Sequence, residues 1–198
     1  MIFAVLLLGA CSPGVEVYEY QNESRLDHVY MKKGVDFSRY KSILIDAVSV
    51  WYPDASAPSL ENAAKAKSNL ARGQALFKQM IEDALDDVYP LTDSPGINVL
   101  RIHAEFVDLR SIPPGGAIPA DFSRKKFRTR PGHITLVVEL MDSRSGEVLA
   151  RAADLGKNES RGGDGVVDWD AIEADFRYWA DILRTWLDKV HHLETEVS

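Results

Sequence analysis

The chain has 198 residues, which suits one domain with a short additional segment. Its hydrophobic fraction of 45% is high enough for a packed core and excludes a disordered chain. A net charge of -7 argues against nucleic-acid binding, because phosphate contacts need clustered lysines and arginines. One cysteine excludes an intrachain disulfide and a multi-cysteine metal site, and we expect neither a cofactor nor a resident metal.

The first ten residues, MIFAVLLLGA, have the length and apolar character of a signal peptide and are too short to span a bilayer. The sequence Leu8-Gly9-Ala10-Cys11 follows, and it resembles the lipobox of bacterial lipoproteins. This resemblance implies that Cys11 is acylated and becomes the first residue of the mature chain. The alternative is an ordinary buried thiol in a short apolar strand. Ser12 follows the cysteine, and in the lipoproteins that this segment resembles a serine there permits export to the outer membrane. The resemblance therefore implies the periplasmic face of the outer membrane of a Gram-negative bacterium rather than retention in the inner membrane.

Residues 11–27 are polar with scattered aromatics, and we interpret them as a lipid-anchored tether that is partly docked. A single globular domain is expected over residues 28–198. Its first core strand lies in residues 41–51, which are apolar on both faces. Asp46 interrupts this strand, and we expect it near the strand's end, accepting hydrogen bonds from the backbone or from a Lys or Arg.

A helix is predicted from an N-cap at Ser59 to Val88, where Tyr89-Pro90 stops it. This strand–helix order is typical of a crossover unit, with a short strand near Leu91 as the receiver. Residues 100–106 then alternate between apolar and polar, which predicts a strand with one wet face. Residues 134–140 and 148–152 repeat the alternation around a turn at 142–146, which predicts a β-hairpin.

The last helix is the clearest element. Residues 169–190 carry apolar side chains at spacings of three and four, with Asp168 as the N-cap. A tryptophan stripe could also belong to a membrane-surface helix, but the polar face is acidic, so core packing is favoured. Together these elements predict an α/β (α+β) fold with two layers, in which two main helices pack on a mixed β-sheet of four to six strands.

Three segments carry a family resemblance. Residues 35–42 read VDFSRYKS, residues 140–150 read LMDSRSGEVLA, and the helix over 176–187 follows. This ordered set after a lipobox resembles the domain-of-unknown-function 3313 family of Gram-negative lipoproteins, a likeness that covers nearly all of the mature chain. The resemblance implies a location and a build, and it implies no activity.

No nucleophile elbow, Walker loop or dinucleotide fingerprint is present, so we expect no enzyme. His103 and Glu105 have a zinc-deaminase spacing but lack the further cysteines, and the wet face of a strand explains them better. The segment 162–168, GGDGVVD, is similar to calcium-binding nonapeptides, but a loop leading to an N-cap explains it better. Two further groups are interpreted as solvated by default, with a metal or partner role as the alternative: His191 and His192, and the acidic residues Glu82, Asp83, Asp86 and Asp87.

The most informative charge pattern is a basic segment that follows a Pro/Gly-rich loop. Five basic residues in this segment are candidates for contact with an anionic surface: Arg124, Lys125, Lys126, Arg128 and Arg130. The alternative is a solvated loop paired with the protein's own acids. The sequence therefore predicts a lipid-anchored envelope lipoprotein that acts as a non-catalytic interaction or assembly module. It holds to the membrane through acylated Cys11 and has an envelope protein as its possible partner. The second function is binding of anionic lipid or cell-wall polymer through the basic segment, and a hydrolase is the third.

Overall fold

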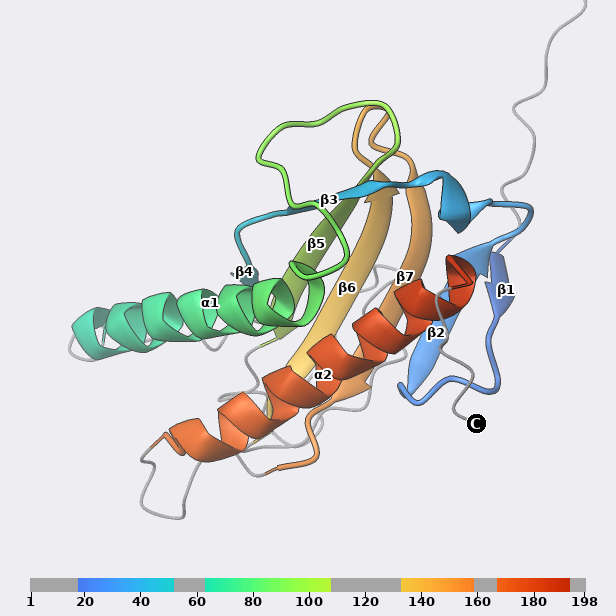
Figure 1. Cartoon of the computed structure of the whole chain (residues 1–198). Coiled ribbons are helices and arrows are strands. Elements are labelled where there is room, and N and C mark those ends of the chain that lie inside the picture. Colours follow the sequence, from blue (N-terminus) through green and yellow to red (C-terminus); the bar gives the residue numbers. More distant parts are fainter. Residues whose placement is uncertain (1–17, 52–62, 108–132, 159–166, 193–198) are drawn as a thin grey trace, which may run out of the picture.

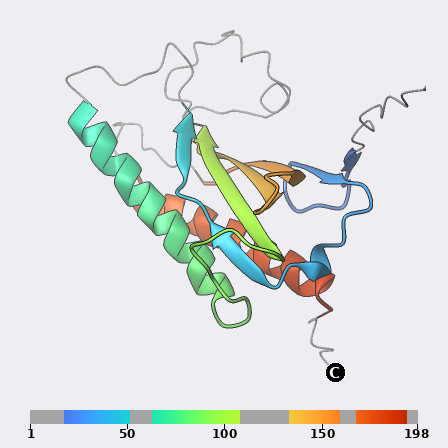
Figure 2. The same cartoon turned by 90° about the horizontal axis from the view of Figure 1, so that it is seen from above.

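The structure is a computed structural model that describes residues 18–51, 63–107, 133–158 and 167–192. One seven-stranded mixed sheet forms the centre, and two helices, α1 (Ala63–Leu85) and α2 (Trp169–Val190), pack on one of its faces (Figure 1). Figure 2 shows the same two layers after a rotation of 90°, with both helices on one side of the strands. The predicted fold class, an α+β mixed sheet with two main helices, is confirmed.

Six strands lie side by side in the order β1-β2-β7-β6-β5-β3. Their bounds are β1 Tyr18–Tyr20, β2 His28–Lys32, β3 Ser42–Ile45, β5 Val99–Val107, β6 Thr135–Asp142 and β7 Val148–Leu155. The seventh strand, β4 (Ser49–Trp51), pairs with β5 beyond the end of β3. The strand predicted over 41–51 is therefore two short strands, both parallel to β5, with a break at residues 46–48.

The crossover runs from β3 and β4 through α1 to β5, so β5 is the receiving strand. Leu91, near which the receiving strand was predicted, makes a single parallel bridge to Ile43. α1 ends at Leu85 rather than at the predicted Val88, and the Leu85 carbonyl accepts the N–H groups of Val88 and Tyr89. Ser59, its predicted N-cap, lies outside the described residues. The predicted hairpin is β6–β7, and α2 begins as expected, with the Asp168 carboxylate accepting the N–H groups of Asp170 and Ala171.

The core lies between the sheet and the helices. Its centre is aromatic, because Phe176 of α2 stacks on Phe106 of β5 at 5.1 Å between ring centroids and meets Phe77 of α1 edge-on at 5.3 Å. The apolar stripe of α2 therefore packs in the core, as predicted, and does not form a surface feature. Gly73 of α1 faces Trp169 of α2, and a Cβ at this position would lie 4.0 Å from the indole ring, an ordinary contact distance.

The segment predicted as a partly docked tether, residues 11–27, joins the sheet from Tyr18 onward. β1 pairs antiparallel with β2, the Tyr18 hydroxyl donates to the Val148 carbonyl, and the Asp27 N–H donates to the Asp154 carboxylate. Six residues, 12–17, separate Cys11 from β1. Fully extended, the path from Cys11 to Tyr18 is about 25 Å long, so a lipid on Cys11 would hold the folded body within that distance of the bilayer.

Candidate functional site

A row of polar side chains crosses the face of the sheet opposite the helices. Along β5, Leu100, Ile102 and Ala104 point into the core, so the alternate residues Arg101 and His103 lie on the other face. The strand register places His103 opposite Glu139 of β6 and Glu139 opposite Arg151 of β7. We call the following five residues the polar row: Asp46, Arg101, His103, Glu139 and Arg151.

Asp46 anchors one end of the polar row. Arg101 donates from Nε to both Asp46 carboxylate oxygens at 2.9 and 2.8 Å, and His103 Nδ1 lies 3.0 Å from Oδ2. The Asp46 side chain is 16% exposed, and those of Arg101 and His103 are each 38% exposed. The prediction that Asp46 lies near a strand end and accepts hydrogen bonds from the backbone or from a Lys or Arg is confirmed, with Arg101 as the side-chain donor. The histidine partner was not predicted.

The other end of the polar row is an ion pair that continues into aromatic rings. Arg151 Nε donates to Glu139 at 2.8 Å, and Arg151 lies opposite Tyr30 of β2. Tyr30 in turn lies opposite Tyr20 of β1, with ring centroids 5.2 Å apart. A half-exposed surface of paired charges thus passes into a tyrosine surface at the β1 edge of the sheet.

The geometry of Asp46 and His103 resembles half of a charge-relay arrangement, because the carboxylate holds Nδ1 of the imidazole. A general base of this kind relies on an uncompensated carboxylate to stabilise the imidazolium as it forms. Here the guanidinium of Arg101 already compensates Asp46. Arg101, Asp46 and His103 therefore form a hydrogen-bonded, charge-compensated group on the surface of the sheet.

A second carboxylate, Asp142, joins the two motifs that carry the family resemblance. Its Oδ1 accepts the N–H groups of Arg144 and Ser145 at 3.0 and 2.9 Å, and its Oδ2 accepts from Arg39 and Tyr40 at 2.8 and 3.0 Å. These donors, the Ser145 N–H foremost, lower the pKa of Asp142 from 3.8 to about 2. Asp142 therefore ties the β6–β7 turn to the segment before β3, which is a structural role.

Two more carboxylates are buried and hold loops in place. Asp154 accepts the indole N–H of Trp179 at 2.7 Å and the N–H of Asp27 at 2.9 Å. Asp175 of α2 accepts the N–H of Lys157 at 3.0 Å and the side-chain amide of Asn158 at 2.7 Å. Burial raises the pKa of both Asp154 and Asp175, and these hydrogen bonds oppose the rise. Each oxygen atom of the two carboxylates has a donor from the chain itself, so we assign both a structural role.

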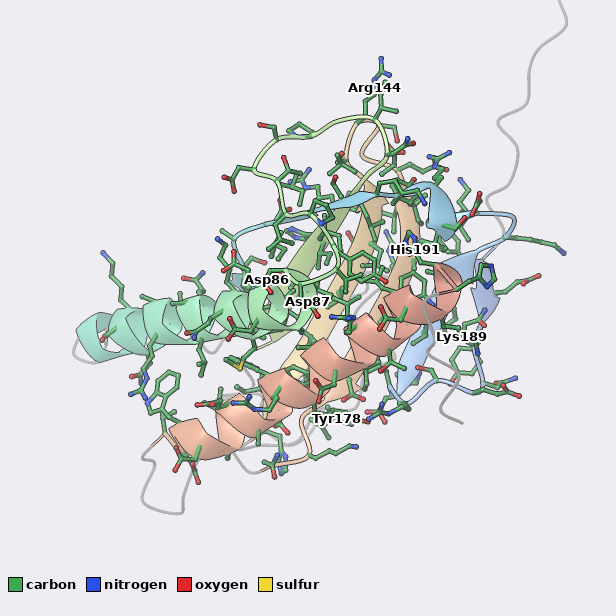
Figure 3. The ribbon with its side chains drawn as sticks, in the orientation of Figure 1. Asp86, Asp87, Arg144, Tyr178, Lys189 and His191 are labelled. Atoms are coloured by element: carbon green, nitrogen blue, oxygen red, sulfur yellow. The ribbon has the colours of Figure 1, made fainter. Side chains whose placement is uncertain are left out.

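The ends of the two helices are joined by Arg184 of α2. Its Nη1 donates to the Ala84 carbonyl at 2.7 Å, which caps the last turn of α1, and to Asp87 at 2.5 Å. Its Nε donates to both oxygens of Asp188, which also accepts the Tyr89 hydroxyl at 2.8 Å. Figure 3 shows Asp87 at the end of α1, on the side that faces α2.

The remaining candidates from the sequence fall into two groups. Cys11, the basic segment with Arg124, Lys125, Lys126, Arg128 and Arg130, and residues 162–166 lie outside the described residues. His191 packs edge-on against Tyr89 with ring centroids 5.4 Å apart, and burial lowers its pKa. Of the acidic residues, Glu82 pairs with Lys78 and Asp87 with Arg184. Within the described part of the chain, no three metal-ligating side chains converge.

Sequence reasoning missed the Glu139–Arg151 pair and the link between Asp142 and Tyr40. The alternation of β6 and β7 places Glu139 and Arg151 on the wet face, so a register prediction for the hairpin could have found the pair. No sequence signal joins Asp142 to Tyr40, which is 102 residues away.

The family model described as "Protein of unknown function (DUF3313)" matches residues 17–183, and the chain belongs to this family. A comparison with curated proteins found no match. No helix in the described part of the chain has the length and apolar character needed to cross a membrane.

Several solved structures resemble the chain. PelC from Paraburkholderia phytofirmans, a dodecamer, is 9% identical, with a TM-score of 0.39 over 79% of this chain and 96% of that one. A DUF4136 family protein from Bacteroides thetaiotaomicron is 10% identical, with a TM-score of 0.42 over 84% and 96%. A candidate lipoprotein from Caulobacter crescentus is 12% identical, with a TM-score of 0.35 over 82% and 96%.

Proposed function

We propose that this DUF3313 protein is a lipoprotein of the Gram-negative envelope, held through acylated Cys11 at the periplasmic face of the outer membrane. The apolar stretch of residues 1–10 and the small residues directly before Cys11 support lipidation. The short path from Cys11 to β1 is compatible with a body that stays close to a bilayer. Acyl chains contribute about 0.8 kcal/mol per buried CH₂, so two or three chains hold a soluble body stably.

The folded domain acts as a non-catalytic interaction or assembly module. The observation that carries this proposal is that four carboxylates among the described residues are engaged by donors of the chain itself. Asp142, Asp154 and Asp175 hold loops, and Asp46 is compensated by Arg101. The polar row remains as a half-exposed, fixed surface with paired charges, and such surfaces give specificity in protein contacts through electrostatic complementarity.

The anchoring part is tested by fractionating cells that express the full chain or its Cys11→Ser variant. The parent should remain with the outer-membrane fraction after a high-salt wash, and the variant should leave it. Release of both forms to the same extent would contradict the anchor.

The interaction part is tested by photo-cross-linking in intact cells. A photoreactive residue replaces Arg151 on the polar row or, as a control, Arg177, an exposed residue of α2. We expect a discrete adduct with an envelope protein from the Arg151 position only. The same adducts from both positions, or adducts from neither, would contradict a specific surface on the sheet.

A second candidate function is binding of anionic lipid or cell-wall polymer. The charge pattern of the basic segment favours it, because five basic residues lie within residues 124–130 of a chain whose net charge is -7. Vesicles and purified cell-wall polymer, offered separately to the unacylated chain, distinguish the two ligands.

A further inference from the structure

The connection between α1 and β5 gathers exposed apolar side chains. The described residues include four large hydrophobic side chains that are clearly exposed: Tyr20, Val88, Leu91 and Ile97. Three of the four lie in residues 86–98, which we call the apolar loop. Ile97 is the most exposed of them, at 73%.

The apolar loop presents Ile97 from a fixed backbone. The Gly96 N–H donates to Ser143 Oγ at 3.0 Å, and Ser143 Oγ donates back to the Gly96 carbonyl at 3.2 Å. The Asn98 carbonyl accepts the Lys41 N–H at 2.8 Å, and Asn98 itself has a left-handed φ of 60°. The contacts on both sides of Ile97 thus tie it to the β6–β7 turn and to the start of β3.

The apolar loop lies at the end of the sheet from which the path to Cys11 leaves. Tyr18, the first residue of β1, donates to Val148 at the start of β7, and Ser143 at the end of β6 bonds to Gly96. Arg144 marks this end in Figure 3, at the tip of the β6–β7 turn. From β1 to β3 the end of the sheet is about 24 Å wide at ~4.8 Å per strand, similar to the maximum reach from Cys11 to Tyr18.

We infer that this end of the domain faces the bilayer and that Ile97 of the apolar loop contacts the lipid surface. The inference rests on the proposed lipid anchor. Six residues separate Cys11 from β1, so an acylated Cys11 would place a membrane next to this end of the sheet. The bilayer is therefore the surface that Ile97 contacts. Lys33 and Arg144 are exposed at the same end, and Lys33 is paired there with Glu19 at 3.4 Å. Acidic Asp36 and Asp93 lie there too, so the contact depends on apolar Ile97 rather than on net charge.

The test uses the acylated full chain in vesicles of phosphatidylethanolamine and phosphatidylglycerol. Cys11 is the chain's one cysteine and its thiol is consumed by acylation, so an Ile97→Cys variant can be labelled at one position with an environment-sensitive fluorophore. Lys67→Cys is the matched control, because Lys67 is also exposed and lies near the start of α1, about 27 Å along the helix from Leu85.

We expect nitroxide-labelled lipids to quench the fluorophore at position 97 several-fold more than at position 67, with a blue-shifted emission at position 97 only. Equal quenching at the two positions in an acylated, vesicle-bound chain would overturn the inference and leave the lipid anchor standing. A chain with a free Cys11 thiol that does not sediment with the vesicles would overturn the anchor, and the inference with it.

Discussion

Asp142 should make the stability of the domain depend on pH in a predictable way. Its donors lower its pKa from 3.8 to about 2, and its side chain is 15% exposed. At ~1.36 kcal/mol per pKa unit, this shift corresponds to about 2 kcal/mol of stability at neutral pH. Because the folded-state pKa is lowered, this stability is present above pH 3.8 and is lost as the pH falls towards about 2.

The perturbation is Asp142→Asn, which keeps the shape and one acceptor oxygen. In the parent, Oδ2 of Asp142 accepts hydrogen bonds from Arg39 and Tyr40. The amide nitrogen that replaces Oδ2 in the variant cannot accept them. We expect the free energy of unfolding at pH 7 to fall by about 2 kcal/mol. Urea denaturation followed by tryptophan fluorescence measures it for parent and variant, and their difference should shrink as the pH is lowered from 3.8 towards 2.

The control is Glu173→Gln, whose carboxylate makes an exposed ion pair with Arg177 on α2. Exposed pairs of this kind contribute about 0.3–0.5 kcal/mol, so this variant should unfold almost like the parent. If Asp142→Asn has the same free energy of unfolding as the parent at pH 7, the structural role assigned to Asp142 is refuted. The same holds if the difference between the two proteins keeps its full size near pH 2.

Three further changes test other parts of the account. Gly156→Ala would drive a methyl group into the Asp175 carboxylate and should cost at least about 2 kcal/mol of stability, read by thermal unfolding; an unchanged melting temperature would contradict the packing. Arg184→Ala removes the cap on the Ala84 carbonyl and should cost about 1–3 kcal/mol, read by urea denaturation, with retained stability as the contrary result. Neutralising the basic segment should reduce the fraction of the unacylated chain that sediments with anionic vesicles. Equal binding by parent and variant would refute the proposed contact of the basic segment with anionic lipid. The residues changed together in this last variant are Arg124, Lys125, Lys126, Arg128 and Arg130.

The sequence was sufficient for elements with a long, regular period. Helix α2 repeats its apolar residues over 22 positions, and β5 alternates over nine, so each element's buried face can be predicted from its own residues. The short strands β1 and β2 were missed, because three and five residues with mixed polarity give too little periodicity. They form by pairing on the edge of β7, which is a tertiary effect.

The candidate site could be predicted from the sequence only where a residue's own strand determines its environment. Asp46 was expected to accept hydrogen bonds from the backbone or from a Lys or Arg, because an unpaired carboxylate inside an apolar strand is costly. The identity of the donor depends on the parallel register that places β3 beside β5, and the sequence of either strand alone does not encode this register. The bonds from Asp142 to Arg39 and Tyr40 also depend on chain segments meeting in the fold.

The central claim of the account is that fatty chains on Cys11 hold this domain beside a membrane. Mass spectrometry of the N-terminal peptide of the mature protein, purified from cell membranes, tests it most directly. We expect a chain that begins at Cys11 and carries a diacylglyceryl group on its sulfur and an acyl group on its new amine. An intact peptide spanning residues 10 and 11, with an unmodified thiol, would contradict the claim.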